Sequence, residues 1–200
     1  VRYFDGNWRA LAHIVPYFTL EDFAVHPDEM PNPYLRTVVR QPNSLFERPV
    51  PVGVVSNTYT LAQHSDVIGK CFEGLHAQSV NLDAMNYQVG LTQLGEWMNF
   101  RAYFPDRDGW SYTPAGENRS LALRLECFNS VDGSSRLTIL LGWFRFVCAN
   151  GLVLGETMAA VRTIHDLRLD IDMIPRIITH GMRQVKGEIE RLRGREEAEP

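Results

Sequence analysis

Apolar and polar side chains alternate between residues 85 and 104, which is the period of a β-strand with one buried face. Leu94-Gly95 interrupts the alternation and is typical of a turn. Pairing the two runs across this turn gives apolar pairs on one face, namely Leu91 with Met98, Val89 with Phe100, and Tyr87 with Ala102. The pattern therefore predicts an antiparallel hairpin of residues 85–91 and 98–104, with Phe100 in the core and Arg101 on the opposite face.

A second hairpin is predicted between residues 121 and 145, with Asp132-Gly133 as its turn signal. Its first strand buries alternate residues: Leu121, Leu123, Leu125 and Cys127. On the return strand, Leu140 and Phe144 are expected to meet this apolar row. The opposite face is then expected to carry a mixed set: Arg124, Glu126, Ile139, Leu141, Trp143 and Arg145.

Helical spacing of apolar residues predicts three helices. The first is expected at residues 60–77, because Thr60 and Gln63 have the spacing of a capping box. Residues 156–165 are expected to form the second, after an Asn-Gly turn at residues 150–151. A long amphipathic helix is predicted from Asp170 onward, with Pro175 in its first turn, where proline is tolerated. Its apolar positions are Ile171, Ile174, Ile178, Val185, Ile189 and Leu192.

The first fifty residues contain six of the eleven prolines and predict an irregular arm that wraps the rest of the chain. Short elements are expected there only at residues 20–24 and 37–40. The predicted fold class is α+β, with an antiparallel sheet built of two hairpins, helices packed on one face, and a long C-terminal helix. The predicted organisation is an arm at residues 1–50, a core domain at 51–168, and a C-terminal helix with an acidic tail at 169–200.

Composition does not change the predicted fold, but it argues against several classes of protein. The formal net charge of −4 argues against a protein coated in positive charge, although it allows a local basic patch. Three widely spaced cysteines (Cys71, Cys127 and Cys148) are not a disulfide framework, so we expect free thiols in a reducing cytosol. No apolar run approaches the ~20 residues of a membrane span, and the first residues do not have the pattern of a signal peptide. We therefore expect a cytoplasmic protein with no membrane contact.

Several segments together resemble a family of phage and plasmid proteins designated domain of unknown function 932. They are residues 52–60 (VGVVSNTYT), 129–135 (NSVDGSS), 144–152 (FRFVCANGL) and 162–165 (RTIH). The resemblance covers roughly residues 50–180, and the Arg-x-Val-Cys-x-Asn part is its most specific element. Many family members have a histidine where this chain has Val131, so no role of that histidine transfers. The resemblance implies a protein of a bacterial host cell, encoded on phages, plasmids or chromosomes, without an assigned activity.

No recognisable catalytic motif is present. Cys148 and His165 could form a nucleophile or metal site, but a buried core cysteine and a histidine bonded to the backbone is the favoured interpretation. His64, His76 and His180 lack the spacing of metal ligands on one helix. The glycines at 151 and 155 have no phosphate-loop lysine, and Ser134 and Ser135 fit a turn. We expect no metal and no cofactor.

The strongest candidate site is the polar face of the first hairpin. Exposed aromatics interleaved with arginine and amide side chains suit base stacking and phosphate contact. The candidate residues are Gln88, Trp97, Asn99, Arg101, Tyr103, Arg119, Arg124 and Arg145. The alternative is that a helix or a neighbouring subunit covers these aromatics. The basic stretch from Arg176 to Arg195 could likewise contact nucleic acid, pack against another copy, or be a solvated helix.

Three functional hypotheses follow. The leading one is a non-catalytic mobile-element protein that binds single-stranded DNA, in a homo-oligomer, during recombination or replication. The second is a protein–protein interaction module that modulates a host or phage factor through residues 1–50. The third is an enzyme with an unrecognised site around Cys148 and His165. Salt-dependent oligonucleotide binding separates the first from the second.

Overall fold

Two antiparallel sheets organise the chain in the computed structural model, which describes residues 1–26, 29–105, 110–113, 121–146 and 153–198. The larger sheet has seven strands in the order β1-β5-β6-β8-β9-β10, with β7 also paired to β8. Its strands are β1 (Arg2–Gly6), β5 (Asn86–Leu91), β6 (Trp97–Tyr103), β7 (Ser111–Tyr112), β8 (Leu121–Ser130), β9 (Leu137–Phe146) and β10 (Val153–Thr163). The smaller sheet contains β2 (Phe18–Asp22), β3 (Leu35–Arg40) and β4 (Val50–Ser56).

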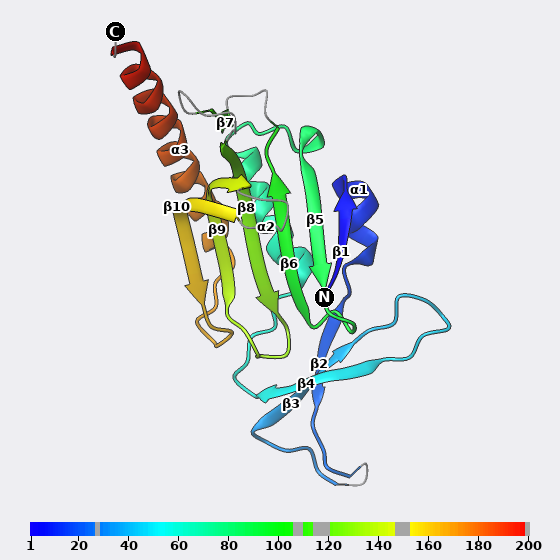
Figure 1. Cartoon of the computed structure of the whole chain (residues 1–200). Helices are drawn as coiled ribbons and strands as arrows, with labels where there is room; N and C mark the ends of the chain where they lie inside the picture. The colour runs from blue at the N-terminus through cyan, green and yellow to red at the C-terminus, as the bar shows by residue number, and fades with distance from the viewer. Residues whose placement is uncertain (27–28, 106–109, 114–120, 147–152, 199–200) are drawn as a thin grey trace.

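Helices α2 (His64–His76) and α3 (Met173–Ala198) cover one face of the larger sheet, and none of the described helices covers the other face (Figure 1). The short α1 (Trp8–Leu11) adds Trp8 to the same core. Two single-turn 3-10 helices, η1 (Ala12–Ile14) and η2 (Leu82–Ala84), complete the structure. The fold class is therefore α+β, as predicted. No helix in the described ranges is long and apolar enough to cross a membrane.

The first predicted hairpin is confirmed, with the predicted register. Leu91 pairs with Met98, and Val89 pairs with Phe100. Phe100 is fully buried between the sheet and the helices, whereas the Arg101 side chain on the opposite face is 25% exposed. One buried apolar face was enough to fix this register, because a one-residue slip would have buried Arg101.

The second hairpin forms at the predicted turn, but the return strand faces the other way from the prediction. Ile139 pairs with Cys127 and Leu141 with Leu125, on the core face. Leu140 and Phe144 lie on the opposite face and are only partly buried. Both alternating rows of β9 are apolar, so alternation alone did not choose between them. The larger row, which includes Leu137 and Trp143, occupies the core.

Two of the predicted helices are wrong, one in its first residue and the other in its type of structure. Helix α2 begins at His64 and not at Thr60, because the Gln63 amide bonds the backbone of Phe18 instead of capping the helix. Residues 156–165 are not helical: residues 156–163 belong to β10, which pairs with β9 and carries an irregularity between Thr157 and Ala159. The long C-terminal helix is confirmed as α3, with Pro175 in its first turn.

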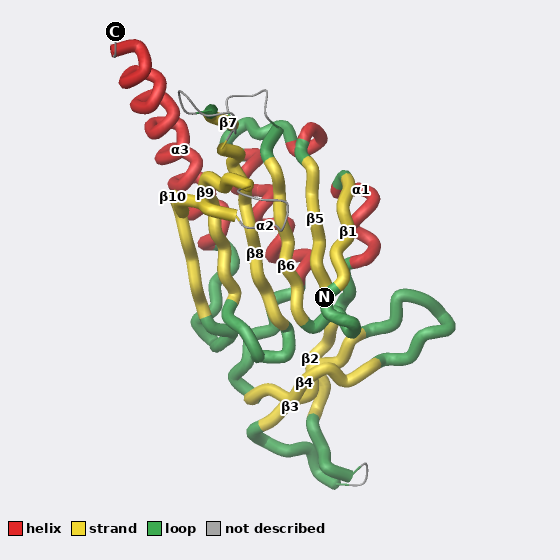
Figure 2. Tube along the Cα trace, in the orientation of Figure 1, coloured by secondary structure: helices red, strands yellow, loops and turns green. Residues whose placement is uncertain are grey.

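The N-terminal fifty residues are not the irregular arm that the prolines predicted. Strand β1 lies at the edge of the larger sheet beside β5, and β2 and β3 form most of the smaller sheet. The smaller sheet projects from one end of the larger one (Figure 2). It has its own small core of Phe18, Val38, Val55 and Val131. The prolines lie mostly between these strands, where a missing N–H costs no ladder hydrogen bond.

Candidate nucleic-acid interface

The helix-free face of the larger sheet brings together the predicted site residues that the structure describes. Trp97, Asn99, Arg101 and Tyr103 alternate along β6 toward this face, beside Gln88 of β5 and Arg124 of β8. The side chain of Arg145 and the whole of Arg119 lie outside the described residues. Their roles stay predictions.

A polar network occupies the half of this face that lies over β1, β5 and β6. The Gln88 amide donates to Asp5 at 2.8 Å and accepts from Arg101 at 2.7 Å. Arg101 Nε donates to Glu126 Oε1 at 2.6 Å, and Arg124 donates to Glu126 Oε2 at 2.9 Å. One carboxylate therefore neutralises much of the charge of two arginines.

Arg124 and Glu126 are also largely removed from solvent, at 7% and 4% exposure. The Arg124 guanidinium lies 3.9 Å from the centre of the Phe144 ring, which covers it. Burial disfavours the charged form of Arg101, but the hydrogen bond and charge of Glu126 outweigh it and raise the arginine pKa. Arg101 thus commits donors to Glu126 and to Gln88, and Arg124 commits one to Glu126.

The other half of the face, over the ends of β6, β8, β9 and β10, is different in character. A groove of about 560 Å³ is lined there by Trp97, Phe128, Ser135, Thr138, Leu140, Ala160, Val161 and Arg162, and we call it the Trp97 groove. The Trp97 and Phe128 rings lie 6.0 Å apart at 46°, both partly exposed. Arg162 is exposed and has no ion pair among the described residues, and the same holds for the nearby Arg136.

The sequence prediction included Trp97 but missed Phe128, Arg136 and Arg162. Arg162 was missed because residues 156–165 were predicted to be helical. A signal for the strand was available, since Thr157, Val161 and Thr163 are β-branched residues of the kind that strands favour. Phe128 was missed because the residues predicted for the opposite face of this strand ended at Glu126.

A buried junction joins the two sheets and α2 below this groove. The Asn129 amide donates to His64 Nδ1 and to the Ala62 carbonyl, each at 2.9 Å. His64 Nε2 lies 2.9 Å from the Gly95 carbonyl, which can only accept, so this nitrogen carries the proton. His64 is fully buried, and burial is the main cause that lowers its pKa to about 4. This histidine is therefore held neutral in one tautomer.

His165 and Tyr59 form the outer part of the same junction. Their rings stack at 5.3 Å and 10°, and His165 Nδ1 donates to the Thr60 carbonyl at 3.2 Å. Burial lowers the pKa of His165, while it raises that of Tyr59 together with the nearby Asp132 charge. The segments of family resemblance around residues 52–60, 129–135 and 162–165 thus meet at one place, as structural partners.

The described residues contain no group of three or more histidines, cysteines and carboxylates placed to hold an ion. Cys71 and Cys127 are buried free thiols. Burial is the first cause that raises the pKa of Cys127, and its hydrogen bond with Cys71 adds to this. Cys148 lies outside the described residues, so its proposed pairing with His165 stays untested.

No curated protein matches the chain, and no solved structure matches it. The model of a family described as a domain of unknown function (DUF932) matches residues 51–198. This segment contains the Trp97 groove and most of the junction residues described above. Because the match spans well over half of the 200 residues, the chain belongs to the DUF932 family.

Proposed function

We propose that this protein binds single-stranded nucleic acid, without catalysing a reaction on it, in the Trp97 groove. The observation that carries the proposal is the combination of partly exposed aromatic rings with arginines that have no ion pair among the described residues, at one end of the sheet face that α2 and α3 leave uncovered. Bases stack on Trp97 and Phe128, and the backbone of the same strand is neutralised by Arg162, which lines the groove, and by Arg136, which follows the lining residue Ser135. Stacking of this kind tolerates any base, because every base has an aromatic face.

The charge distribution favours the groove over the Arg101 network as the proposed binding site. Arg101 and Arg124 donate to Glu126, so a phosphate would have to compete with a carboxylate that is 4% exposed. Arg162 and Arg136 meet no such competitor among the described residues. Since the whole chain carries a net charge of −4, attraction for a polyanion depends on these local cations.

The test is a fluorescence-anisotropy titration of a labelled, mixed-sequence single-stranded DNA at several low salt concentrations. Trp97→Ala is expected to weaken binding by roughly ten- to a hundredfold, the loss of one stacked base. Arg162→Gln is expected to lower the slope of log affinity against log salt by about 0.7, the value for one phosphate contact on a single strand. Arg48→Gln, at an exposed position between β3 and β4, is the matched control and should leave the slope unchanged.

Arg101→Gln adds a comparison within the same face. Its charge already interacts with Glu126, so it is expected to change the salt slope less than Arg162→Gln does. If Arg101→Gln and Arg162→Gln changed the salt slope equally, the Arg101 network would also contact phosphates. No binding at micromolar protein and low salt would refute the nucleic-acid proposal as a whole. A role in recombination or replication is part of the same proposal, and its setting on phages or plasmids is what the family resemblance implies.

A second candidate function is protein–protein interaction through the smaller sheet. Its loops expose large apolar side chains, with Leu45 and Phe46 almost completely exposed between β3 and β4, and Met30 and Tyr34 exposed between β2 and β3. Apolar surface of this kind is typical of interaction sites. Sedimentation velocity of the wild type and a Leu45→Ser/Phe46→Ser variant tests whether a second copy binds there. A concentration-dependent dimer that the variant abolishes would support this function, and identical monomers would oppose self-association.

A further inference from the structure

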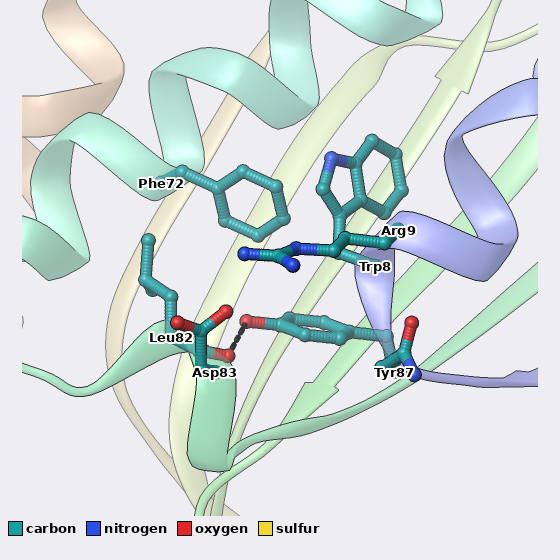
Figure 3. Close-up of a pocket in the computed structure, with 7 residues that line it drawn as sticks. Trp8, Arg9, Phe72, Leu82, Asp83 and Tyr87 are labelled. Carbon is teal, nitrogen blue, oxygen red and sulfur yellow. Dashed lines mark hydrogen bonds between the residues drawn. The ribbon is translucent and has the colours of Figure 1, made fainter.

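A second pocket lies on the helix side of the larger sheet. None of the residues that line it lines the Trp97 groove. This second pocket has a volume of about 480 Å³ and is lined by residues of α1, α2, η2 and β5. The Asn7 side chain accepts from the Ala10 amide at 3.0 Å and so begins α1, which presents Trp8 and Arg9 to this pocket. Figure 3 shows these side chains together.

Three aromatic rings give the pocket its apolar walls. Trp8 and Phe72 are edge-to-face at 5.2 Å, and Phe72 and Tyr87 are edge-to-face at 5.5 Å. Trp8 and Phe72 are partly exposed, whereas Tyr87 is 2% exposed and lies at the bottom. Aromatic walls around a volume of this size suit a small planar ligand.

One cation and one anion complete the lining. In Figure 3 the side chains of Arg9 and Asp83 reach the same end of the pocket, beside the Tyr87 hydroxyl. That hydroxyl donates to the Leu82 carbonyl at 2.8 Å. The Arg9 guanidinium and the Asp83 carboxylate are both exposed, and neither side chain has a hydrogen-bond or ionic partner within the part of the chain that the structure describes.

The pair of opposite charges restricts the ligand. An ammonium ligand would meet Arg9, and a simple anion would meet Asp83, so neither charge sign is favoured. A neutral ring that presents acceptors on one edge and donors on the adjoining edge satisfies both groups at once. Guanine has this arrangement, since its O6 and N7 accept from an arginine fork and its N1–H and N2–H₂ can donate to a carboxylate. Adenine offers one donor group and one acceptor there.

We propose that this pocket binds a guanine base, with the ring against Trp8 and Phe72, O6 and N7 on Arg9, and N1 and N2 on Asp83. The proposal does not depend on strand binding in the Trp97 groove. If both sites act, the protein would bind single strands on one face and select guanine on the other.

The test is calorimetric titration of the full chain with guanosine, inosine and adenosine 5′-monophosphates. The three ligands share the same phosphate, and inosine lacks only the N2 amine of guanosine. The guanosine nucleotide is expected to bind roughly ten- to a hundredfold more tightly than the other two, the discrimination of a good bidentate pair. Asp83→Asn should abolish the difference between the guanosine and inosine nucleotides. Arg9→Gln should weaken both by the same factor, because both carry O6 and N7.

Both substitutions are at exposed positions, and thermal unfolding curves that match the wild type would show that the fold is kept. Arg48→Gln, at an exposed position between β3 and β4, should leave nucleotide affinity unchanged, and Asp83→Asn should leave the strand affinity of the Trp97 groove unchanged, which separates the two sites. Equal affinity for the three nucleotides, or no saturable binding at millimolar ligand, would overturn the proposal. Tighter binding of phenylalanine than of the guanosine nucleotide would also overturn it and assign the pocket to a zwitterionic amino acid.

Discussion

Acidification below pH 6.5 should destabilise this protein through His64. The histidine is fully buried, donates from Nε2 to the Gly95 carbonyl and accepts at Nδ1 from the Asn129 amide. Protonation of Nδ1 would set two N–H donors against each other, because the Asn129 amide is also held by the Ala62 carbonyl. The folded protein therefore resists a proton that the unfolded chain accepts readily.

The size of the effect follows from the pKa of His64, which burial lowers from 6.5 to about 4. The unfolded chain binds more protons between these values, so the free energy of unfolding rises with pH across this window. The stability is fully present above about pH 6.5, is lost as the pH falls toward 4, and does not change further below that for this group. A shift of this size corresponds to about 3 kcal/mol. Burial also lowers the pKa of His165, which acts in the same direction.

The assay is urea unfolding at intervals between pH 4 and 7.5 for the wild type and two variants. His64→Gln removes the titrating group but keeps one donor and one acceptor, so it should flatten the pH dependence between pH 6.5 and 4. His180→Gln, at an exposed position of α3, is the matched control and should follow the wild type. A wild-type pH dependence in His64→Gln would show that His64 does not set the acid sensitivity, and the reasoning from its hydrogen bonds would be wrong.

Three further outcomes are expected. Gly53→Ala should cost about 1–3 kcal/mol of stability in urea unfolding, because its Cβ would lie 2.8 Å from Asp132 Cβ. Gly69→Ala is the control: its Cβ meets nothing within 4 Å, so it should be neutral or stabilising in the same assay. Glu126→Gln should cost about 3 kcal/mol, since it removes the anion between two arginines; stability equal to the wild type would show that the network contributes little. Thiol titration of denatured, unreduced protein should find three free thiols, and a single one would indicate an internal disulfide.

The parts of the fold that were predictable are those where one face of an element is unambiguously apolar. The first hairpin is such a case, because Val89 and Phe100 alternate with Gln88 and Arg101 and leave one register that buries no charge. The C-terminal helix is another, with a continuous apolar stripe. The second hairpin was predicted as an element but with the wrong return face, because Leu140 and Ile139 are equally apolar and only tertiary packing separates them.

The N-terminal strands and β10 depended on partners that lie far away in the sequence. Strand β1 pairs with β5, more than eighty residues later, so no local pattern could place it. Gln63 had the right spacing for a helix cap, but its side-chain amide forms hydrogen bonds with the backbone of Phe18 instead. In each case a long-range hydrogen bond decided between local alternatives that the sequence left nearly equal.

The electrostatics of the candidate site also could not be predicted from the sequence alone. Counting arginines along the chain favoured Arg101 and Arg124, which do lie on the predicted face. What the sequence could not show is that Glu126, from the same strand as Arg124, accepts from both of them. Since a phosphate must displace an existing partner or find a free one, the useful quantity is the number of unpaired cations and not the number of cations. By that measure the better candidate for the binding site is the Trp97 groove, with Arg162 in its lining and Arg136 next to its lining residue Ser135. The salt slopes of Arg101→Gln and Arg162→Gln show directly which of the two arginines contacts phosphate.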